Sequence, residues 1–145
     1  MAYVPPMLQH IKAQDDLKPG EGPVGLVLLP CRELWPQVER EVNVFEDYSR
    51  LQCAAACGGD GHGTQSFDGR DFVHIVVATP GRLLDLLDQK KTNLRRVTYM
   101  VVDEADQMME PNLTIRSSCV ASSDICVEDS CRACFMRQPS RACEK

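Results

Sequence analysis

The sequence predicts an α/β fold in which helices flank a parallel sheet. Three observations predict it. Short apolar runs such as Val24–Leu29 and Thr98–Val102 have the length and composition of buried strands. Between these runs, apolar residues recur at helical spacing. Loops rich in glycine, proline and polar residues separate the two kinds of segment. Strands that alternate with helices pair in parallel through right-handed crossovers.

The expected elements follow one another in a regular order. Helical spacing occurs at residues 3–11, 34–45 and 83–87, and strand-like runs occur at residues 24–29, 51–56, 74–78 and 98–102. Residues 15–23 and 58–63 are expected to be loops because turn-forming residues dominate them.

Length and composition exclude several classes of protein. The chain of 145 residues is long enough for one domain, and its 43% hydrophobic and 26% charged residues exclude wholesale disorder. No apolar run approaches the roughly 20 residues of a membrane span, and no signal peptide is evident. A net charge of −5 argues against coating nucleic acid by bulk charge. We expect an intracellular chain, nuclear or cytoplasmic, that is neither secreted nor in a membrane.

The composition changes near Glu110. Residues 1–110 carry 11 basic and 17 acidic residues and three of the eight cysteines. Residues 111–145 carry the other five cysteines together with many serines and arginines, and show neither helical nor strand periodicity. We expect residues 1–110 to be one partial domain. We expect residues 111–145 to be an unrelated, irregular or disordered tail, of the kind that alternative splicing or out-of-frame translation produces.

The tail offers one candidate metal site. Its possible ligands are Cys126, Cys131, Cys134 and Cys143, and Cys131 and Cys134 form a Cys-x-x-Cys pair. Zinc sites commonly use two close pairs, whereas the other two cysteines lie far apart. The sequence therefore leaves two alternatives: the four tail cysteines bind zinc, or they bind no metal.

Carboxylates follow the last predicted strand. The run at residues 98–102 leads directly into Asp103, Glu104 and Asp106. Adjacent carboxylates at a strand end suit nucleoside-triphosphate hydrolysis: Asp103 would hold Mg²⁺ through water, and Glu104 would orient or deprotonate the attacking water. The alternative is a strand that ends in a solvated acidic turn.

A second strand end has the composition of an anion-binding turn. After Ala78, Thr79 can cap a helix and Pro80 is favoured at its first position. The amides of Gly81 and Arg82 would then be available to an anion, and Arg82 adds a cationic partner. The alternative is an ordinary strand-to-helix turn.

A third strand end has the sequence Pro30-Cys31-Arg32-Glu33-Leu34. Arg32 either points at the same ligand face as the other two motifs or pairs with Glu33 or a helix neighbour.

Taken in order, these segments resemble the first RecA-like domain of the DEAD-box RNA helicases. Pro30–Leu34 resembles motif Ia, Gly58-Gly59 the glycine doublet, Thr79–Leu83 motif Ib, and Asp103–Asp106 the motif that names the family. The resemblance covers about residues 1–110 and implies a RecA-like sheet of the P-loop NTPase type.

The resemblance implies a role for each matching residue. Asp103 and Glu104 would serve ATP hydrolysis with Mg²⁺, and Asp106 would link the nucleotide site to RNA-binding elements. The residues implied to line the path of the RNA backbone are Pro30, Arg32, Gly59, Thr79, Gly81 and Arg82. The implied cofactors are ATP and Mg²⁺. The implied partners are RNA and other helicase or ribonucleoprotein proteins.

The sequence departs from the family in ways that bear on activity. It contains no Gly-x-x-x-x-Gly-Lys-Ser/Thr P-loop, no Ser-Ala-Thr motif and no second RecA-like domain. Cys31 replaces the usual threonine of motif Ia. Without the P-loop strand, we expect one edge of the strand at residues 98–102 to be unpaired. We expect a helicase fragment that lacks ATPase activity on its own; the alternative is a non-catalytic RNA- or protein-binding remnant that competes with a full-length helicase.

Overall fold

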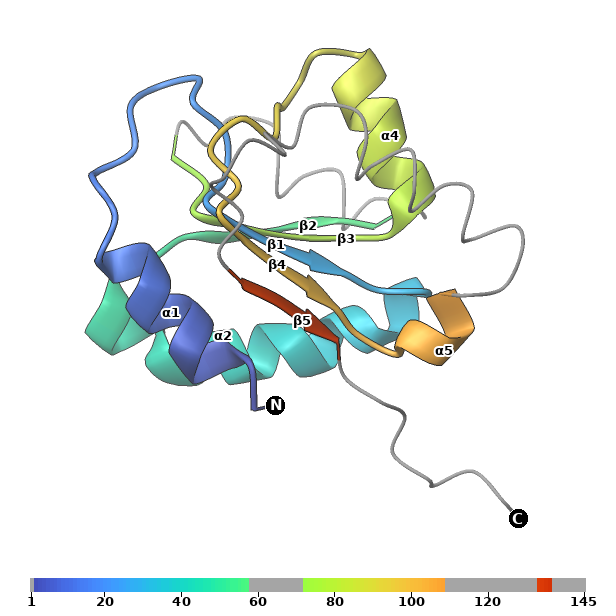
Figure 1. The fold of residues 1–145 in the computed structure, drawn as a ribbon, viewed down its shortest axis with the longest axis horizontal. Helices are drawn as coiled ribbons and strands as arrows, with labels where there is room; N and C mark the ends of the chain where they lie inside the picture. The colour runs from blue at the N-terminus through green and yellow to red at the C-terminus, as the bar shows by residue number, and fades with distance from the viewer. Residues whose placement is uncertain (1, 58–71, 109–132, 137–145) are drawn as a thin grey trace.

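The protein contains a five-stranded sheet with helices on both faces (Figure 1). The computed structural model describes residues 2–57, 72–108 and 133–136. The strand order is β2-β3-β1-β4-β5, and all pairs are parallel. The strands are β1 (Gly25–Leu28), β2 (Cys53–Ala56), β3 (Ile75–Ala78), β4 (Tyr99–Val102) and β5 (Ala133–Met136). The helices are α1 (Val4–Lys12), the 3₁₀ turn η1 (Arg32–Leu34), α2 (Trp35–Ser49), α4 (Pro80–Asp88) and α5 (Ala105–Met108).

Two hydrophobic clusters cover the two faces of the sheet. Helices α1 and α2 lie on one face and α4 lies on the other (Figure 1). Val27 of β1 belongs to the cluster beneath α1 and α2, whereas Leu26 and Leu28 belong to the cluster that includes Leu83 and Leu86 of α4. Because successive strand residues face opposite sides, a strand covered on both faces must be apolar throughout. This explains the uninterrupted apolar run and confirms the predicted fold class.

The structure confirms the predicted helices and strands within residues 1–108. The strands are shorter than the apolar runs that predict them, and each expected helix is present. The structure adds η1 and α5, which span only three and four residues. Elements of that length are too short to show a hydrophobic period.

The edge of β4 that we expected to be unpaired carries β5. Tyr99 pairs with Ala133, and Val102 pairs with Met136. The prediction of an unpaired edge is therefore wrong. The prediction of irregular structure is also wrong for Ala133–Met136, which forms a strand. The physical reason is that strand pairing uses backbone groups, so a run of four apolar residues, too short to be recognised as a strand from its pattern, can complete a ladder. The rest of residues 111–145 lies outside the described residues.

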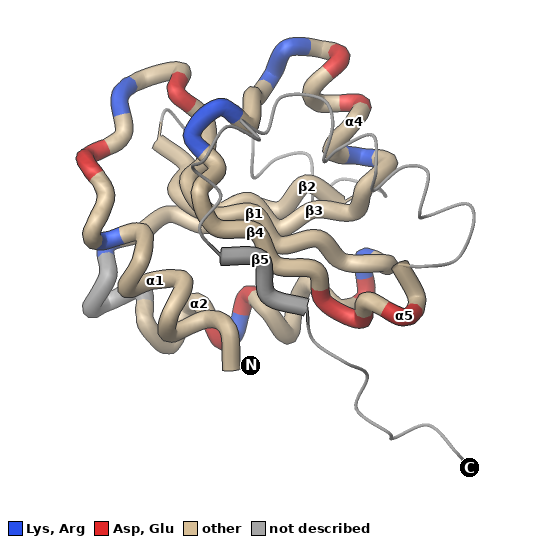
Figure 2. Tube along the Cα trace, in the orientation of Figure 1, with Lys and Arg blue, Asp and Glu red and all other residues tan. Residues whose placement is uncertain are grey.

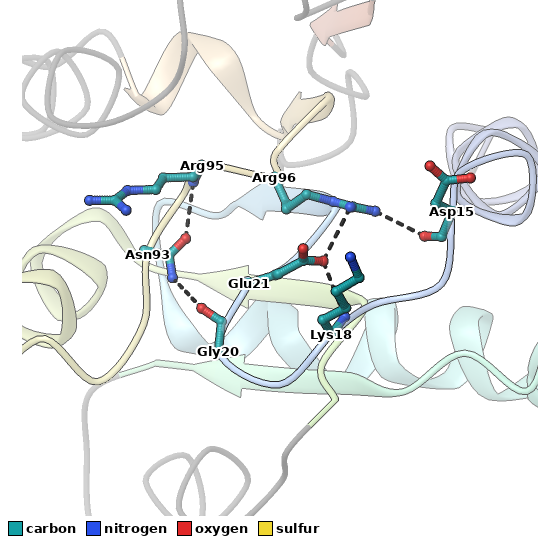
Figure 3. A network of polar contacts seen from close by, with 7 residues as sticks. All are labelled: Asp15, Lys18, Gly20, Glu21, Asn93, Arg95 and Arg96. Atoms are coloured by element: carbon teal, nitrogen blue, oxygen red, sulfur yellow. Dashed lines mark hydrogen bonds and ion pairs between the residues drawn. The ribbon is translucent and has the colours of Figure 1, made fainter.

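A polar network fixes two loops at the amino ends of the strands (Figure 3). Asn93 Nδ2 donates to the Gly20 carbonyl at 2.9 Å. Arg96 forms an ion pair with Glu21 at 3.1 Å and donates to the Asp15 carbonyl at 2.9 Å. The loop before β1 and the loop before β4 are therefore held together, which fixes where these neighbouring strands begin.

A cavity of about 210 Å³ opens at this same edge. Its lining includes Asp16, Arg50 and His74 and none of the residues predicted to form a functional site. The Gln52 N–H donates to His74 Nδ1 at 3.2 Å. Burial lowers the pKa of His74 below its ordinary value, and the nearby Asp16 carboxylate opposes this effect. His74 is therefore held in its neutral form.

Charged residues lie outside the strands, in loops and helices (Figure 2). Among the helices that the structure describes, none has the length and apolar character needed to cross a bilayer.

Replacing Gly22 by alanine should destabilise the protein more than replacing Gly20. Both glycines have positive φ, +80° and +83°, so either substitution incurs a cost of about 1 kcal/mol or more from backbone strain. A Cβ at Gly22 would also lie 2.4 Å from the Asn93 carbonyl oxygen, whereas a Cβ at Gly20 meets nothing within 4 Å. Urea denaturation of the two variants measures the difference. Equal losses of stability would show that the Asn93 contact imposes no constraint.

The His74→Asn variant should lose less stability than the wild type on acidification. The unfolded chain takes up a proton at His74 as the pH falls through about 6.5, while the folded state resists protonation until lower pH. The wild type therefore loses stability over this interval, and asparagine, which keeps an acceptor for the Gln52 N–H, does not titrate. Urea denaturation at about pH 7.5 and pH 5.5 measures this. Parallel losses in both proteins would contradict the assignment.

Candidate functional site

The parallel register brings the predicted motifs to one edge of the sheet. Leu28 is paired with Ala78 on one side and with Val102 on the other. Backbone hydrogen bonds continue beyond the strands, from Thr79 N to the Ala56 carbonyl at 3.2 Å and from Asp103 N to the Leu28 carbonyl at 3.0 Å. The three predicted strand-end motifs therefore lie side by side, as expected for the carboxyl ends of parallel strands.

Asp103 is the buried charge of this edge. It is 2% exposed, and it is the one buried polar or charged residue within the described ranges. Its Oδ2 accepts a hydrogen bond from the Tyr3 hydroxyl at 2.9 Å, and its Oδ1 accepts one from the Glu104 N–H at 3.1 Å. A buried carboxylate requires such donors, because an unpaired charge in the interior is very costly.

The other two carboxylates face outward from the turn that follows β4. Glu104 has a φ of +51°, which few residues other than glycine adopt. Its carbonyl accepts the N–H groups of Gln107 and Met108 at 3.0 and 3.2 Å, so that it starts α5. Glu104 is half-buried and Asp106 is exposed. The chain thus reverses direction sharply at Glu104, leaving one carboxylate in the interior and two nearer to solvent.

The turn after β3 has the predicted conformation but not the predicted side-chain cap. Thr79 is extended at the N-cap of α4, and Pro80 occupies the first turn. The Thr79 side chain makes no capping hydrogen bond, although its carbonyl accepts the Leu83 N–H at 3.0 Å. Arg82 lies 4.0 Å from Asp85 and keeps 22% of its side chain exposed. At this length the i,i+3 contact with Asp85 holds the guanidinium only weakly.

In the third motif, Arg32 forms one of the contacts that the sequence leaves open. Its Nε donates to Glu33 Oε1 at 3.3 Å, and both side chains are mostly exposed. Arg32 therefore pairs with its neighbour. Such an exposed pair contributes little stability and can exchange for a stronger anionic partner. Pro30 lies directly before this turn and is half-buried.

Two cysteines at this edge are protonated thiols at neutral pH. Burial raises the pKa of Cys57 to about 11, and its thiol donates to the Val77 carbonyl at 3.9 Å. Burial also raises the pKa of Cys31, with a further contribution from its hydrogen bond with Glu33. Because the thiolate is the reactive form, neither cysteine is suited to act as a nucleophile here.

The donor set suits a hard cation only as part of a larger complex. Among residues 2–57, 72–108 and 133–136, no group of three or more His, Cys, Asp or Glu side chains could hold a metal ion. Mg²⁺ commonly uses one or two carboxylates and takes its other ligands from water and substrate phosphates. Asp103 and Glu104 fit that pattern. Gly59 and the tail cysteines Cys126, Cys131 and Cys143 lie outside the described residues, and the side chain of Cys134 is not described.

Sequence reasoning missed Tyr3 as a member of this site. The helical spacing at residues 3–11 indicates only that Tyr3 occupies an apolar position of the first helix. The contact joins residues far apart in the chain, and no spacing or motif predicts it.

Comparison with known proteins agrees with this arrangement. Residues 1–123 match the family described as DEAD/DEAH box helicase. Over 110 residues the chain is 49% identical to the ATP-dependent RNA helicase DBP2 of Mycosarcoma maydis and 50% identical to that of Schizosaccharomyces pombe. It is 46% identical to DEAD-box ATP-dependent RNA helicase 20 of Oryza sativa. These alignments cover 76% of this chain and 20–22% of each relative, so the chain spans about a fifth of their length.

The fold agrees as well. The crystal structure of the yeast DEAD-box splicing factor Prp28 superposes with a TM-score of 0.78 at 26% identity, covering 94% of this chain and 33% of that chain. The match establishes a RecA-like sheet flanked by helices. The family profile, the relatives and the shared fold together show that the chain belongs to the DEAD-box RNA helicase family.

Proposed function

We propose that this chain supplies part of the first RecA-like domain of an ATP-dependent RNA helicase, and that the 145-residue polypeptide alone does not hydrolyse ATP. One observation carries the proposal. The carboxylates that the reaction needs are assembled at the end of β4, while the sequence contains no P-loop to cradle phosphates. The relatives named above are ATP-dependent, and of the groups that such chemistry uses this sequence contains the carboxylate pair but no P-loop motif.

The described residues fit two roles in ATP hydrolysis, namely holding the cation and activating the attacking water. When bound, Mg²⁺-ATP supplies the phosphoryl group and the charge that polarises it. Asp103 would hold that cation through a bound water molecule. Glu104, half-buried beside it, would orient the attacking water or accept its proton. Asp106 is exposed on α5, and this exposure supports the linking role that we propose for it.

The same polypeptide lacks the groups that hold the phosphates. A P-loop provides backbone amides, a lysine and a hydroxyl, and each stabilises charge on the β- and γ-phosphates or their metal. Positioning and charge stabilisation supply almost all of the catalysis in phosphoryl transfer. A carboxylate pair without that cradle therefore has nothing to act upon.

RNA contact is the activity that the edge itself can support. Pro30, Arg32, Thr79, Gly81 and Arg82 lie at the same strand ends as the carboxylates, and Gly59 belongs to the same expected set. Arg82 is held only weakly by Asp85, and Arg32 only by an exposed pair. Arginines and backbone amides bind phosphates without reading bases, so binding would be insensitive to sequence and sensitive to salt.

A second candidate function follows from that edge. The chain would be a non-catalytic remnant that binds RNA, or the proteins that a helicase meets, and competes with a full-length helicase. The observation that favours it is that the sequence contains segments resembling the family's RNA-contacting motifs but no P-loop motif. A nucleotide-binding assay separates the two functions. Measurable ATP binding favours the helicase fragment, whereas RNA binding without ATP binding favours the non-catalytic remnant.

Purified 145-residue chain should show no RNA-stimulated ATPase activity. The reason is the missing phosphate cradle. Phosphate release with and without single-stranded RNA measures it, and a full-length DBP2 protein serves as the active control. A rate that is stimulated by RNA and abolished by Glu104→Gln would overturn the proposal.

Arg82→Ala should weaken binding to single-stranded RNA in the absence of ATP. Loss of one phosphate contact should reduce the slope of log affinity against log salt by about 1. Fluorescence anisotropy with labelled RNA at several salt concentrations measures both effects. Arg95→Ala is the matched control, because Arg95 is exposed at the opposite edge of the sheet. Equal effects of the two substitutions would show that binding is not located at the motif edge.

A further inference from the structure

The two edges of the sheet are held in different ways. At one edge, β2 contacts α2 and α4 in addition to its neighbouring strand β3. At the other edge, β5 makes its main contact within the described ranges with β4 alone (Figure 1). The strand β5 is therefore held through a single ladder of four residue pairs, without the helices that secure β2.

The hydrogen bonds of β4 show which of its backbone groups face β5. The Tyr99 N–H donates to the Val24 carbonyl at 3.2 Å, so the backbone groups of Tyr99 are directed toward β1. Successive residues of a strand direct their backbone groups to alternate sides. Met100 and Val102 therefore direct theirs toward β5. If β5 were released, these groups would form the open edge of an apolar strand, which is a template for another strand.

The register between parallel strands shows which member of each pair makes the hydrogen bonds. In the pair of β1 with β4, Tyr99 is directed toward β1. Its partner Gly25 is directed away from β4, because its N–H donates to the His74 carbonyl at 2.9 Å on the other side of β1. One member of a registered pair thus bonds to the opposite strand and the other does not.

The same rule assigns the backbone groups of β5. Met100 is registered with Cys134, and Val101 is registered with Phe135. Because Met100 is directed toward β5, the N–H of Cys134 is directed away from β4. The N–H of Phe135 is directed toward β4. Two neighbouring residues of β5 therefore differ in whether a proline would remove a donor from the ladder.

A short strand at an edge can be released and can also exclude other strands. It has a partner on one side only, and the connection through residues 109–132 must close a loop at a cost in entropy before the ladder forms. Once formed, it competes with a free segment from within the same chain, at a local concentration that a free segment at micromolar concentration does not reach.

We propose that β5 is a displaceable closing strand that blocks a strand-addition site on β4, and that the partner of this site is the same segment of a second copy of the chain. Ala133–Met136 is the segment that the structure pairs in register with this edge, and every copy of the chain carries it. Strand addition derives its affinity from main-chain hydrogen bonds. The inference depends neither on ATP hydrolysis nor on RNA binding.

A labelled peptide with the sequence of residues 130–138 tests this by standing for the tail strand of a second copy. Fluorescence anisotropy under reducing conditions measures its binding to the full 145-residue chain and to three variants. Phe135→Pro removes the N–H that is directed toward β4, Cys134→Pro removes one that is directed away, and Phe135→Val changes the same side chain but keeps its N–H. We expect Phe135→Pro to bind the peptide about tenfold more tightly than the wild type, and the other two to bind it like the wild type.

Three results would overturn the inference. If Phe135→Pro binds the peptide no more tightly than the wild type, opening the ladder creates no site. If Phe135→Pro and Cys134→Pro gain equally, the gain does not come from the ladder with β4, because the two prolines act on opposite sides of β5. If a peptide with proline at the position of Phe135 binds as tightly as the unmodified peptide, binding does not use a strand ladder.

Amide hydrogen exchange of the wild type covers the case in which Phe135→Pro does not fold. If β5 is released while the rest of the sheet stays intact, the N–H groups of Met100 and Val102 should exchange at least about tenfold faster than those of Tyr99 and Val101, which are directed toward β1. Nuclear magnetic resonance measures these rates, corrected for the intrinsic rate of each residue. Equal rates would contradict the inference, because β5 would then be released only when the whole sheet opens.

Discussion

The position of β1 between β3 and β4 is the constraint on which the rest of the structure depends. Its residues pair in register with both neighbours, and its side chains enter both hydrophobic clusters. This arrangement requires an apolar strand and helices on both faces. Because the strands are parallel, it also places all their carboxyl ends at one edge of the sheet and all their amino ends at the opposite edge. The polar motifs therefore meet at the carboxyl edge, while the Asn93–Gly20 and Arg96–Glu21 contacts hold the amino edge.

The chemistry of the carboxyl edge depends on which charges are buried. Asp103 is inside and needs donors from the protein, whereas Arg32, Arg82 and Asp106 keep contact with solvent. Burial keeps the thiols of Cys31 and Cys57 protonated, so they contribute packing and not reactivity. This edge therefore combines arginines that reach solvent with an inner carboxyl group that accepts hydrogen bonds from Tyr3 and Glu104.

Most of the fold follows from local patterns in the sequence, and much of the site does not. Apolar runs and helical spacing predict the elements, and their alternation predicts the parallel sheet with its motifs at one edge. The Tyr3–Asp103 contact could not be predicted, because it depends on packing between distant segments. The pairing of Arg32 with Glu33 could not be predicted either, because it depends on the side-chain conformations of two exposed residues. The strand at Ala133–Met136 consists of only four apolar residues, a run too short to show a strand period.

The order of the strands in the sheet also determines the order in which the protein can fold. Gly25 in β1 pairs with Ile75 and Tyr99, so the central strand has no sheet neighbour until distant parts of the chain have left the ribosome. No hairpin can nucleate this sheet, and long loops must close before any ladder stabilises it. During synthesis, the most apolar segment of the chain therefore remains uncovered longest, and it is the segment that a chaperone would need to shield.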